Sequence, residues 1–198
     1  PLFEGVTLDL LKKQGWAKGA VDSPRRKGVN SGTWPTPSGK IEIYSQQMAD
    51  LGLDPMPGHV PEVEGLSGVD ASSPYPLQVI SGATHYFIGS TFQHVEHLQN
   101  MLSRPTFELN SQDADKRSIS EGDICRLFND RGEVFGHAHI VKGLREGVIG
   151  APKQLQGSKM KNGFNLNALT SQKEADMGRG PVYYSTLAEI QKVEVKSS

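Results

Sequence analysis

The stretch DICRLFNDRGEVFGHAHIV, residues 123–141, carries the clearest structural signal in the sequence. Two runs rich in β-forming residues, 123–128 and 133–141, flank the segment Asn129-Asp130-Arg131-Gly132. Asn, Asp and Gly tolerate the backbone conformations that tight turns need, so the stretch predicts a β-hairpin. Side chains alternate along a strand, and one face of the second run carries Val134, Gly136, Ala138 and Ile140. Small inward side chains of this kind are typical of the crowded interior of a small β-barrel.

Short strand-like runs continue on both sides of this hairpin. They lie at Leu77–Ser81, Thr106–Leu109, Gly147–Ala151 and Ala188–Val195. Helical spacing occurs at Gln93–Leu102, and Ser111 is a good N-cap for a helical turn over Asp113–Lys116. Because 22 Gly and 12 Pro occur among 198 residues, many turns and short strands are expected. We therefore predict a mainly β fold with short helices.

The first part of the chain has a different composition. Residues 1–40 carry seven Lys or Arg against three Asp or Glu, whereas residues 41–75 carry six acidic residues and no Lys or Arg. Prolines recur at positions 55, 57, 61, 74 and 76. We predict an irregular lead-in over residues 1–73, with a helix at Val6–Gln14 and a strand near residues 40–45, and a barrel domain over residues 74–198.

The overall composition excludes several function classes. The net charge of −1 gives no reason to expect a nucleic-acid partner or a membrane surface, and no apolar run approaches the length of a membrane span. The single cysteine, Cys125, excludes an internal disulfide and a cysteine-built zinc or iron–sulfur cluster within this chain. Because it lies among strand residues, Cys125 is best interpreted as a small buried hydrophobic residue.

The segment Ser81–Thr91, Ser-Gly-Ala-Thr-His-Tyr-Phe-Ile-Gly-Ser-Thr, is the best candidate for a binding loop. Its first glycine directly follows a strand and lets the backbone approach a ligand closely. Hydroxyls and free N–H groups beside it are suitable donors for a pyrophosphate. The same composition also fits a polar connection in which Ser90 or Thr91 caps a helix. Composition alone leaves both interpretations open.

His137 and His139 suggest a second kind of site. Their spacing places both rings on one face of a strand, as in some metal sites. A cupin-like metal centre needs further ligands, and the next acidic residue, Glu146, comes too late for that motif. A position facing solvent or another domain is the simpler interpretation of both histidines.

Several segments, taken in order, resemble the C-terminal molydopterin dinucleotide-binding domain of the dimethyl sulfoxide reductase family of molybdenum and tungsten oxidoreductases. They are TPSGKIEIYS at 36–45, LGLDP at 51–55, the loop at 81–91, LNSQDA at 109–114, EGD at 121–123 with NDRG at 129–132, and GFNLNALT at 163–170 followed by DMG at 176–178. The sequence departs from the family's pattern at position 111 and over residues 152–155. Ser111 replaces a proline, and Pro152-Lys153-Gln154-Leu155 lacks the glycine and tryptophan common in that loop.

The resemblance implies a double-psi β-barrel, also known as the aspartate-decarboxylase-like barrel. It further implies a bis-molybdopterin guanine dinucleotide cofactor with Mo or W. By match to the family's motifs, the cofactor-binding residues would be Ser81, Gly82, Ala83, Thr84, His85, Tyr86, Ser90, Thr91, Asn110, Asp113, Asn167 and Tyr184. Asn110 and Asp113 fit turn formation around Ser111 equally well. Some family members carry a lysine near the position of Tyr184.

The resemblance also implies that catalysis depends on residues outside this chain. The chain matches no family residue that ligates the metal, so the chain alone is expected to be inactive, as one domain of a longer enzyme of the prokaryotic cytoplasm or periplasm. Its partners would be the remaining domains of the parent catalytic chain, and an iron–sulfur electron-transfer subunit is a further candidate. Two alternatives stay open: a cupin-like metal-binding barrel using His137 and His139, and a free-standing double-psi barrel that recognises other proteins.

Overall fold

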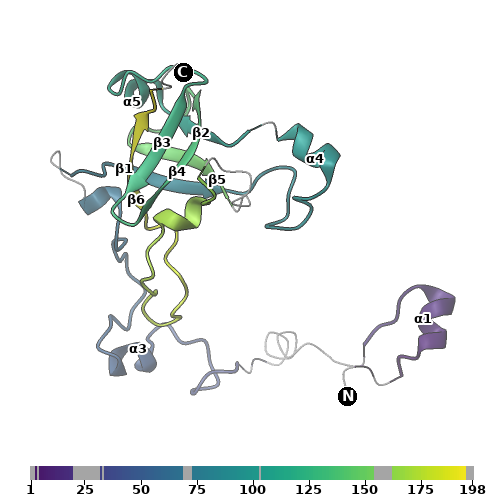
Figure 1. The fold of residues 1–198 in the computed structure, drawn as a ribbon. Helices are drawn as coiled ribbons and strands as arrows, with labels where there is room; N and C mark the ends of the chain where they lie inside the picture. The colour runs from purple at the N-terminus through teal and green to yellow at the C-terminus, as the bar shows by residue number, and fades with distance from the viewer. Residues whose placement is uncertain are drawn as a thin grey trace. The chain divides into compact units, whose positions relative to one another are not determined.

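A computed structural model of the chain describes residues 3, 5–19, 32, 34–68, 73–102, 104–153 and 162–194. The chain divides into two compact units, Pro1–His59 and Val60–Ser198. Figure 1 shows that the strands of the second unit wrap around one another. Among the described residues, no helix has both the length and the apolar character needed to cross a membrane.

The described part of the first unit contains the helices α1 (Leu8–Gln14) and α3 (Gln46–Asp50). At the start of α1, the Thr7 hydroxyl accepts a hydrogen bond from the N–H of Leu10 at 3.1 Å. The helix ends at Gly15, whose φ of 75° is the left-handed conformation that favours glycine at this position. These bounds confirm the helix predicted near Val6–Gln14.

The strand predicted near residues 40–45 is absent from the structure. The segment consists of bends and extended backbone, and Ile41 and Ile43 are 68% and 67% exposed. Alternation of apolar and polar residues produces a strand only where another strand supplies hydrogen bonds and an apolar face to cover. The described residues provide neither here, and Ser45 instead caps α3 by accepting from the N–H of Met48.

The second unit is a closed barrel with the strand order β1-β5-β2-β4-β3-β6. The strands are β1 (Leu77–Gly82), β2 (Thr106–Leu109), β3 (Ile124–Asn129), β4 (Gly132–Ile140), β5 (Val148–Pro152) and β6 (Leu187–Lys192). The pairs β1–β5 and β2–β4 are parallel, whereas the remaining pairs are antiparallel. This closed, mixed barrel is the double-psi β-barrel that the family resemblance implies. All predicted strands of this unit are present, although Val195 at the end of the last one lies outside the described residues.

The predicted hairpin forms β3 and β4 and supplies much of the core. Cys125 and Leu127 point inward from β3, and Val134, Gly136 and Ala138 point inward from β4. The ring of Phe107 from β2 lies so close to Gly136 that a Cβ there would be 2.9 Å from the ring. The lack of a side chain at Gly136 is therefore required by its large neighbour on β2.

The helices of the barrel domain have different bounds from those that the sequence pattern predicts. Helix α4 (Glu96–Met101) begins three residues later than Gln93, because a turn containing Phe92 at φ 70° precedes it. Helix α5 (Ser111–Asp115) begins two residues before the predicted start at Asp113. Its cap is Asn110, which accepts from the N–H of Gln112 at 2.8 Å, so the prediction of Ser111 as the cap was wrong.

Residues shortly before β1 contact the barrel. Glu64 and Arg131 form a bidentate ion pair, in which Nη1 and Nη2 of Arg131 donate to the two carboxylate oxygens at 2.9 and 2.8 Å. The N–H of Leu66, at the start of the 3₁₀ helix η1 (Leu66–Gly68), donates to the buried side chain of Gln78 at 3.1 Å. The segment around residues 64–68 thus belongs physically to the second unit.

Candidate cofactor site

The C-terminal ends of β1 and β5 lie side by side at the centre of the candidate site. The two strands are parallel with Gly82 opposite Pro152, and the N–H of Lys153 donates to the carbonyl of Gly82 at 2.9 Å. Because side chains alternate along β1, Ser81 and Gly82 face opposite sides of the sheet. Each of these two residues lines a separate hollow.

The first hollow, which we call the outer groove, has a volume of about 360 Å³ and is lined by β1, β2, β5 and their connecting loops. Its lining is mainly apolar, with polar groups from Thr84, His85, Thr106 and Glu108. Glu108 lies opposite Gly150, where a Cβ would be 2.8 Å from its carboxylate. The absence of a side chain at Gly150 therefore leaves room for this carboxylate. An apolar groove with a few polar groups suits a flat heteroaromatic ring.

The second hollow, which we call the end pocket, has a volume of about 200 Å³ and is lined by Ser81, Lys153, Leu166, Asn167, Thr170 and Tyr183. The hydroxyl of Tyr184 lies beside it, 3.5 Å from the carbonyl of Ser81. The lining residues that the structure describes supply hydroxyls, an amide and an ammonium group, but no carboxylate. The end pocket is therefore suited to a ligand rich in hydrogen-bond acceptors.

The short 3₁₀ helix η3 (Leu166–Leu169) presents Asn167 to the end pocket. Asn165 caps this helix by accepting from the N–H of Asn167 at 3.0 Å, and Thr170 donates its hydroxyl to the carbonyl of Asn167 at 2.9 Å. The backbone of Asn167 is thus fixed from both sides. Its exposed side-chain amide makes no hydrogen bond to any residue that the structure describes.

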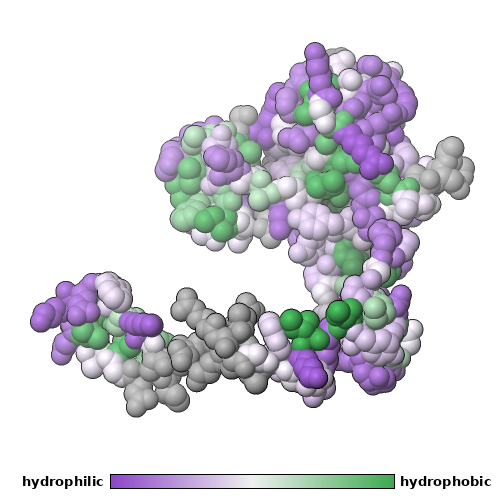
Figure 2. All heavy atoms as spheres, turned by 180° about the vertical axis from the view of Figure 1, so that it is seen from behind, coloured by the Kyte–Doolittle hydropathy of each residue, from purple (hydrophilic) through white to green (hydrophobic). Residues whose placement is uncertain are grey.

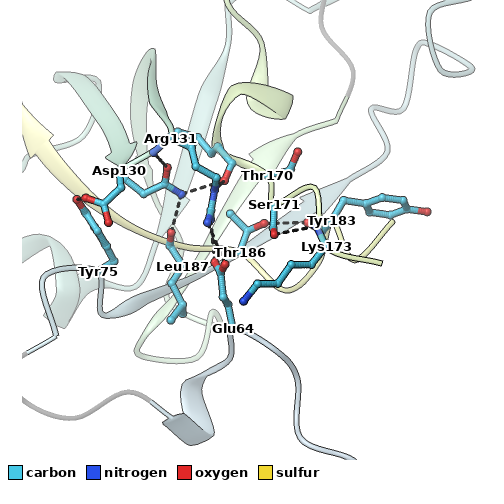
Figure 3. Close-up of polar contacts among 12 residues, drawn as sticks. Glu64, Tyr75, Asp130, Arg131, Thr170, Ser171, Lys173, Tyr183, Thr186 and Leu187 are labelled. Atoms are coloured by element: carbon cyan, nitrogen blue, oxygen red, sulfur yellow. Dashed lines mark hydrogen bonds and ion pairs between the residues drawn. The ribbon is translucent and has the colours of Figure 1, made fainter. Parts of the chain in front are cut away.

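The tip of the β3–β4 hairpin fixes the other end of η3 (Figure 3). The carbonyl of Leu169 accepts from the amide of Asn129 at 2.9 Å and from Nε of Arg131 at 2.7 Å. Asn129 is buried and also donates to the carbonyl of Leu187, at the start of β6. The carboxylate of Glu64 accepts hydrogen bonds from the other two nitrogens of the Arg131 guanidinium group. The Asn-Asp-Arg-Gly turn thereby links η3 to the barrel as well as reversing the chain.

The predicted loop after β1 is only partly in the site. Ala83, Thr84 and His85 line the outer groove, and the ring of His85 packs edge-on against Tyr86 at a centroid distance of 5.5 Å. Tyr86 packs against the core and lines neither hollow. Ser90 and Thr91 are exposed and also line neither hollow.

Asn110 and Asp113 have structural partners in the barrel. Asn110 caps α5, and its amide donates to the carbonyl of Leu144 at 2.6 Å. Asp113 is buried, accepts from the N–H of Gly147 at 2.8 Å and lies 3.6 Å from Arg117. These contacts correspond to the turn-forming interpretation of both residues. Neither residue lines the outer groove or the end pocket.

The two histidines of β4 lie outside both hollows. Nδ1 of His137 is 3.2 Å from the carbonyl of Gly122, and Nδ1 of His139 is 3.1 Å from the Glu121 carboxylate. The N–H of Ile140 donates to this carboxylate and is the largest cause of the lowered pKa of Glu121. The hydrogen bond with His139 lowers the same pKa further. Within the described ranges, no three His, Cys, Asp or Glu side chains are grouped as metal ligands would be.

Cys125 is fully buried on β3, as predicted for a small hydrophobic residue. Burial raises the pKa of its thiol to about 11, with a smaller contribution from Asp123. A thiol that stays protonated at neutral pH is a poor nucleophile and a poor metal ligand.

Sequence reasoning missed several residues that line the hollows, chiefly Lys153, Thr170, Tyr183, Thr106 and Glu108. Lys153 lies two residues after the predicted strand Gly147–Ala151. The position of Lys153 beside the end of β1 could not be predicted, because no local feature of the sequence shows that β5 pairs in parallel with β1. Tyr183 adjoins the predicted Tyr184, and their rings lie 5.0 Å apart.

Comparison with known proteins identifies the family. Residues 77–187 match the model of the molydopterin dinucleotide binding domain, and the chain belongs to this family. The chain is 32% identical over 196 residues to the probable oxidoreductase YoaE of Bacillus subtilis (strain 168), covering 98% of this chain and 27% of that protein. It is 33% identical over 172 residues to the dimethyl sulfoxide reductase DmsA of Escherichia coli (strain K12), covering 80% of this chain and 21% of the relative. The chain therefore spans about a quarter of the length of these relatives.

A solved structure supports the fold. The chain superimposes on acetylene hydratase from Pelobacter acetylenicus with a TM-score of 0.77 and 19% sequence identity. The superposition covers 96% of this chain and 28% of acetylene hydratase. The expected relationship to the dimethyl sulfoxide reductase family is confirmed by the family model together with these relatives.

Proposed function

We propose that this chain binds a bis-molybdopterin guanine dinucleotide cofactor carrying Mo or W, as the cofactor-binding domain of a longer oxidoreductase. The observation that carries the proposal is the arrangement of the two hollows at the ends of β1 and β5. Both adjoin the loop expected to bind the cofactor, in a chain that belongs to a dinucleotide-binding family.

The chemistry of the lining fits such a ligand. A pterin or guanine ring is flat and has N–H and carbonyl groups on its edge, which suits the apolar walls and polar side chains of the outer groove. Phosphate oxygens accept hydrogen bonds, which suits the Ser81 hydroxyl and the Asn167 amide of the end pocket. We assign Ser81, Gly82, Ala83, Thr84, His85 and Asn167 to direct binding, with Tyr184 at the margin.

The remaining predicted residues have different proposed roles. Tyr86 supports His85 from the core side, and Asn110 and Asp113 stabilise the barrel. Ser90 and Thr91 lie on an exposed loop, where they would reach the cofactor only if another part of the protein held the loop against it. The proposed site therefore centres on the strand ends.

In this proposal the bound metal supplies the redox chemistry, and the residues of this chain bind and orient the cofactor. The relatives are several times longer than this chain, so other segments have room to supply a metal ligand and an iron–sulfur cluster.

Hydrophobic side chains lie on the outside of the lobe that carries α4 (Figure 2). Ile88, Phe92 and Met101 are 73%, 43% and 57% exposed there, and we assign this surface to contact with the rest of the longer protein.

The test is to purify the intact protein from a host that makes the cofactor and to denature it under oxidising conditions. We expect fluorescent pterin and GMP in equal amounts, together with Mo or W detected by mass spectrometry. A protein that contains metal but no pterin would favour the cupin-like alternative. A protein with neither would favour a free-standing protein-recognition barrel, and either result would overturn the proposal.

A further inference from the structure

We propose that the ammonium group of Lys153 binds a phosphate of the cofactor in the end pocket. The inference rests on the proposed function and deepens it, because it names a binding residue and the part of the cofactor that the residue contacts. Lys153 was not among the residues expected from the family's motifs, and the sequence around it departs from the usual family loop.

The first support is the charge of the end pocket. Among the described residues that line it, Lys153 carries the only charge and none has a carboxylate. The side chain is half-buried and forms no ion pair with any other residue in the described ranges. A lysine partly removed from water without a counter-ion is stabilised when an anion binds beside it.

The second support is that the position of Lys153 is fixed. Its N–H donates to the carbonyl of Gly82, which attaches the residue directly after β5 to the end of β1. Its Nζ lies 5.7 Å from the centre of the Tyr183 ring, within the range of a cation–π contact. The contact keeps the ammonium group near Tyr183, which lines the end pocket together with Ser81 and Asn167.

The contrast with the outer groove places the phosphate in the end pocket. Of the described residues that line the outer groove, Glu108 is charged and none is Lys or Arg. A carboxylate repels a phosphate but accepts hydrogen bonds from the N–H groups of a pterin or guanine edge. The charges of the described lining residues are thus opposite in the two hollows. Of the two, the end pocket favours the anionic part of a dinucleotide.

The experiment compares four forms of the intact protein: wild type, Lys153→Met, Lys153→Arg and the control Lys142→Met. Lys142 is an exposed lysine that lines neither hollow. Each form is passed through gel filtration at low and at high ionic strength, and the pterin that remains bound is measured after denaturation. Unfolding midpoints and circular dichroism show whether each variant is folded.

We expect Lys153→Met to retain about tenfold less pterin than wild type, as loss of a charge-assisted hydrogen bond implies. Lys153→Arg should restore most of the retention, Lys142→Met should match wild type, and wild type should lose pterin at high ionic strength more steeply than Lys153→Met does. Equal retention by folded Lys153→Met and wild type would overturn the inference, as would failure of the arginine to restore it. A wild-type protein without pterin would instead overturn the proposed function.

Discussion

Gly136 and Phe107 show how a single small residue shapes the interior of this barrel. The Phe107 ring occupies the space beside Gly136, where a Cβ would approach it to 2.9 Å. We predict that Gly136→Val lowers the free energy of unfolding by about 1–3 kcal/mol, because extra volume forces the ring or the strand to shift. Urea denaturation of the 198-residue chain would measure the change.

The matched control for this prediction is Gly143→Ala, in an exposed turn where an added Cβ meets no atom within 4 Å. We expect its unfolding free energy to stay close to that of wild type. If Gly136→Val were as stable as wild type, the close packing between β2 and β4 would not contribute to stability as the structure indicates.

Asp123 gives a prediction for pH dependence. The hydrogen bond from Lys192, at 2.8 Å, and a smaller contribution from the N–H of Ser120 lower the pKa of this carboxyl below its reference value of 3.8. Because the pKa is lower in the folded protein, the ionised carboxylate stabilises the fold above pH 3.8, and this contribution disappears as the pH falls through the folded-state pKa.

The expected result is that wild type is more stable than Asp123→Asn at neutral pH and that the difference shrinks towards acidic pH. Urea unfolding at a series of pH values would measure it, with the exposed Asp115→Asn as the control variant. A difference that is constant over the whole series would show that the ion pair with Lys192 makes no contribution through Asp123 ionisation.

At the scale of elements, the tip of the β3–β4 hairpin has a second role, in holding η3. The Asn129 amide bonds both Leu169 and Leu187, and it is buried. We predict that Asn129→Ala lowers the free energy of unfolding by about 1–3 kcal/mol, because the partly buried carbonyl of Leu187 loses this donor. Leu169 keeps its hydrogen bond from Arg131, which limits the loss.

Loosening of η3 should also be visible at Asn167, which this helix presents to the end pocket. In the Asn129→Ala variant we expect faster amide hydrogen exchange at Ala168 and Thr170, whose N–H groups donate within η3. The variant Asp130→Ala, at the exposed neighbouring position, is the comparison. Unchanged exchange in Asn129→Ala would mean that Asn129 stabilises β6 alone.

The elements that the sequence predicted well are those whose cause is local. Strand β2 has the predicted bounds, and the hairpin follows from the turn residues between two alternating runs. Helix α4 was overextended, because apolar spacing does not reveal the turn at Phe92. The strand expected at residues 40–45 failed for a related reason, since a strand depends on a partner that alternation cannot supply.

At the scale of the whole molecule, the site could be predicted only in part, because it is assembled by non-local pairing. The glycine and hydroxyls after β1 indicated where a ligand would approach, and the outer groove is there. Lys153 and Thr170 reach the same region only because β5 pairs with β1 and the hairpin tip holds η3. The β1–β5 pairing joins residues 70 positions apart and the bond from the hairpin tip to η3 joins residues 40 positions apart, and no local pattern reports either contact.

Gly82 connects the barrel with the proposed function and gives the last prediction. A Cβ at Gly82 would meet no atom within 4 Å, so Gly82→Val should leave the barrel folded with an unchanged unfolding midpoint. The added side chain would nevertheless occupy the outer groove beside Thr84 and His85, where the cofactor ring is proposed to lie. We therefore expect the intact Gly82→Val protein to contain about tenfold less pterin, the consequence of losing roughly 1.4 kcal/mol of binding free energy. Gly143→Val, at an exposed turn, is the matched control and should retain the wild-type amount. A folded Gly82→Val protein with full pterin content would remove the outer groove from the site and leave the end pocket as its sole supported part.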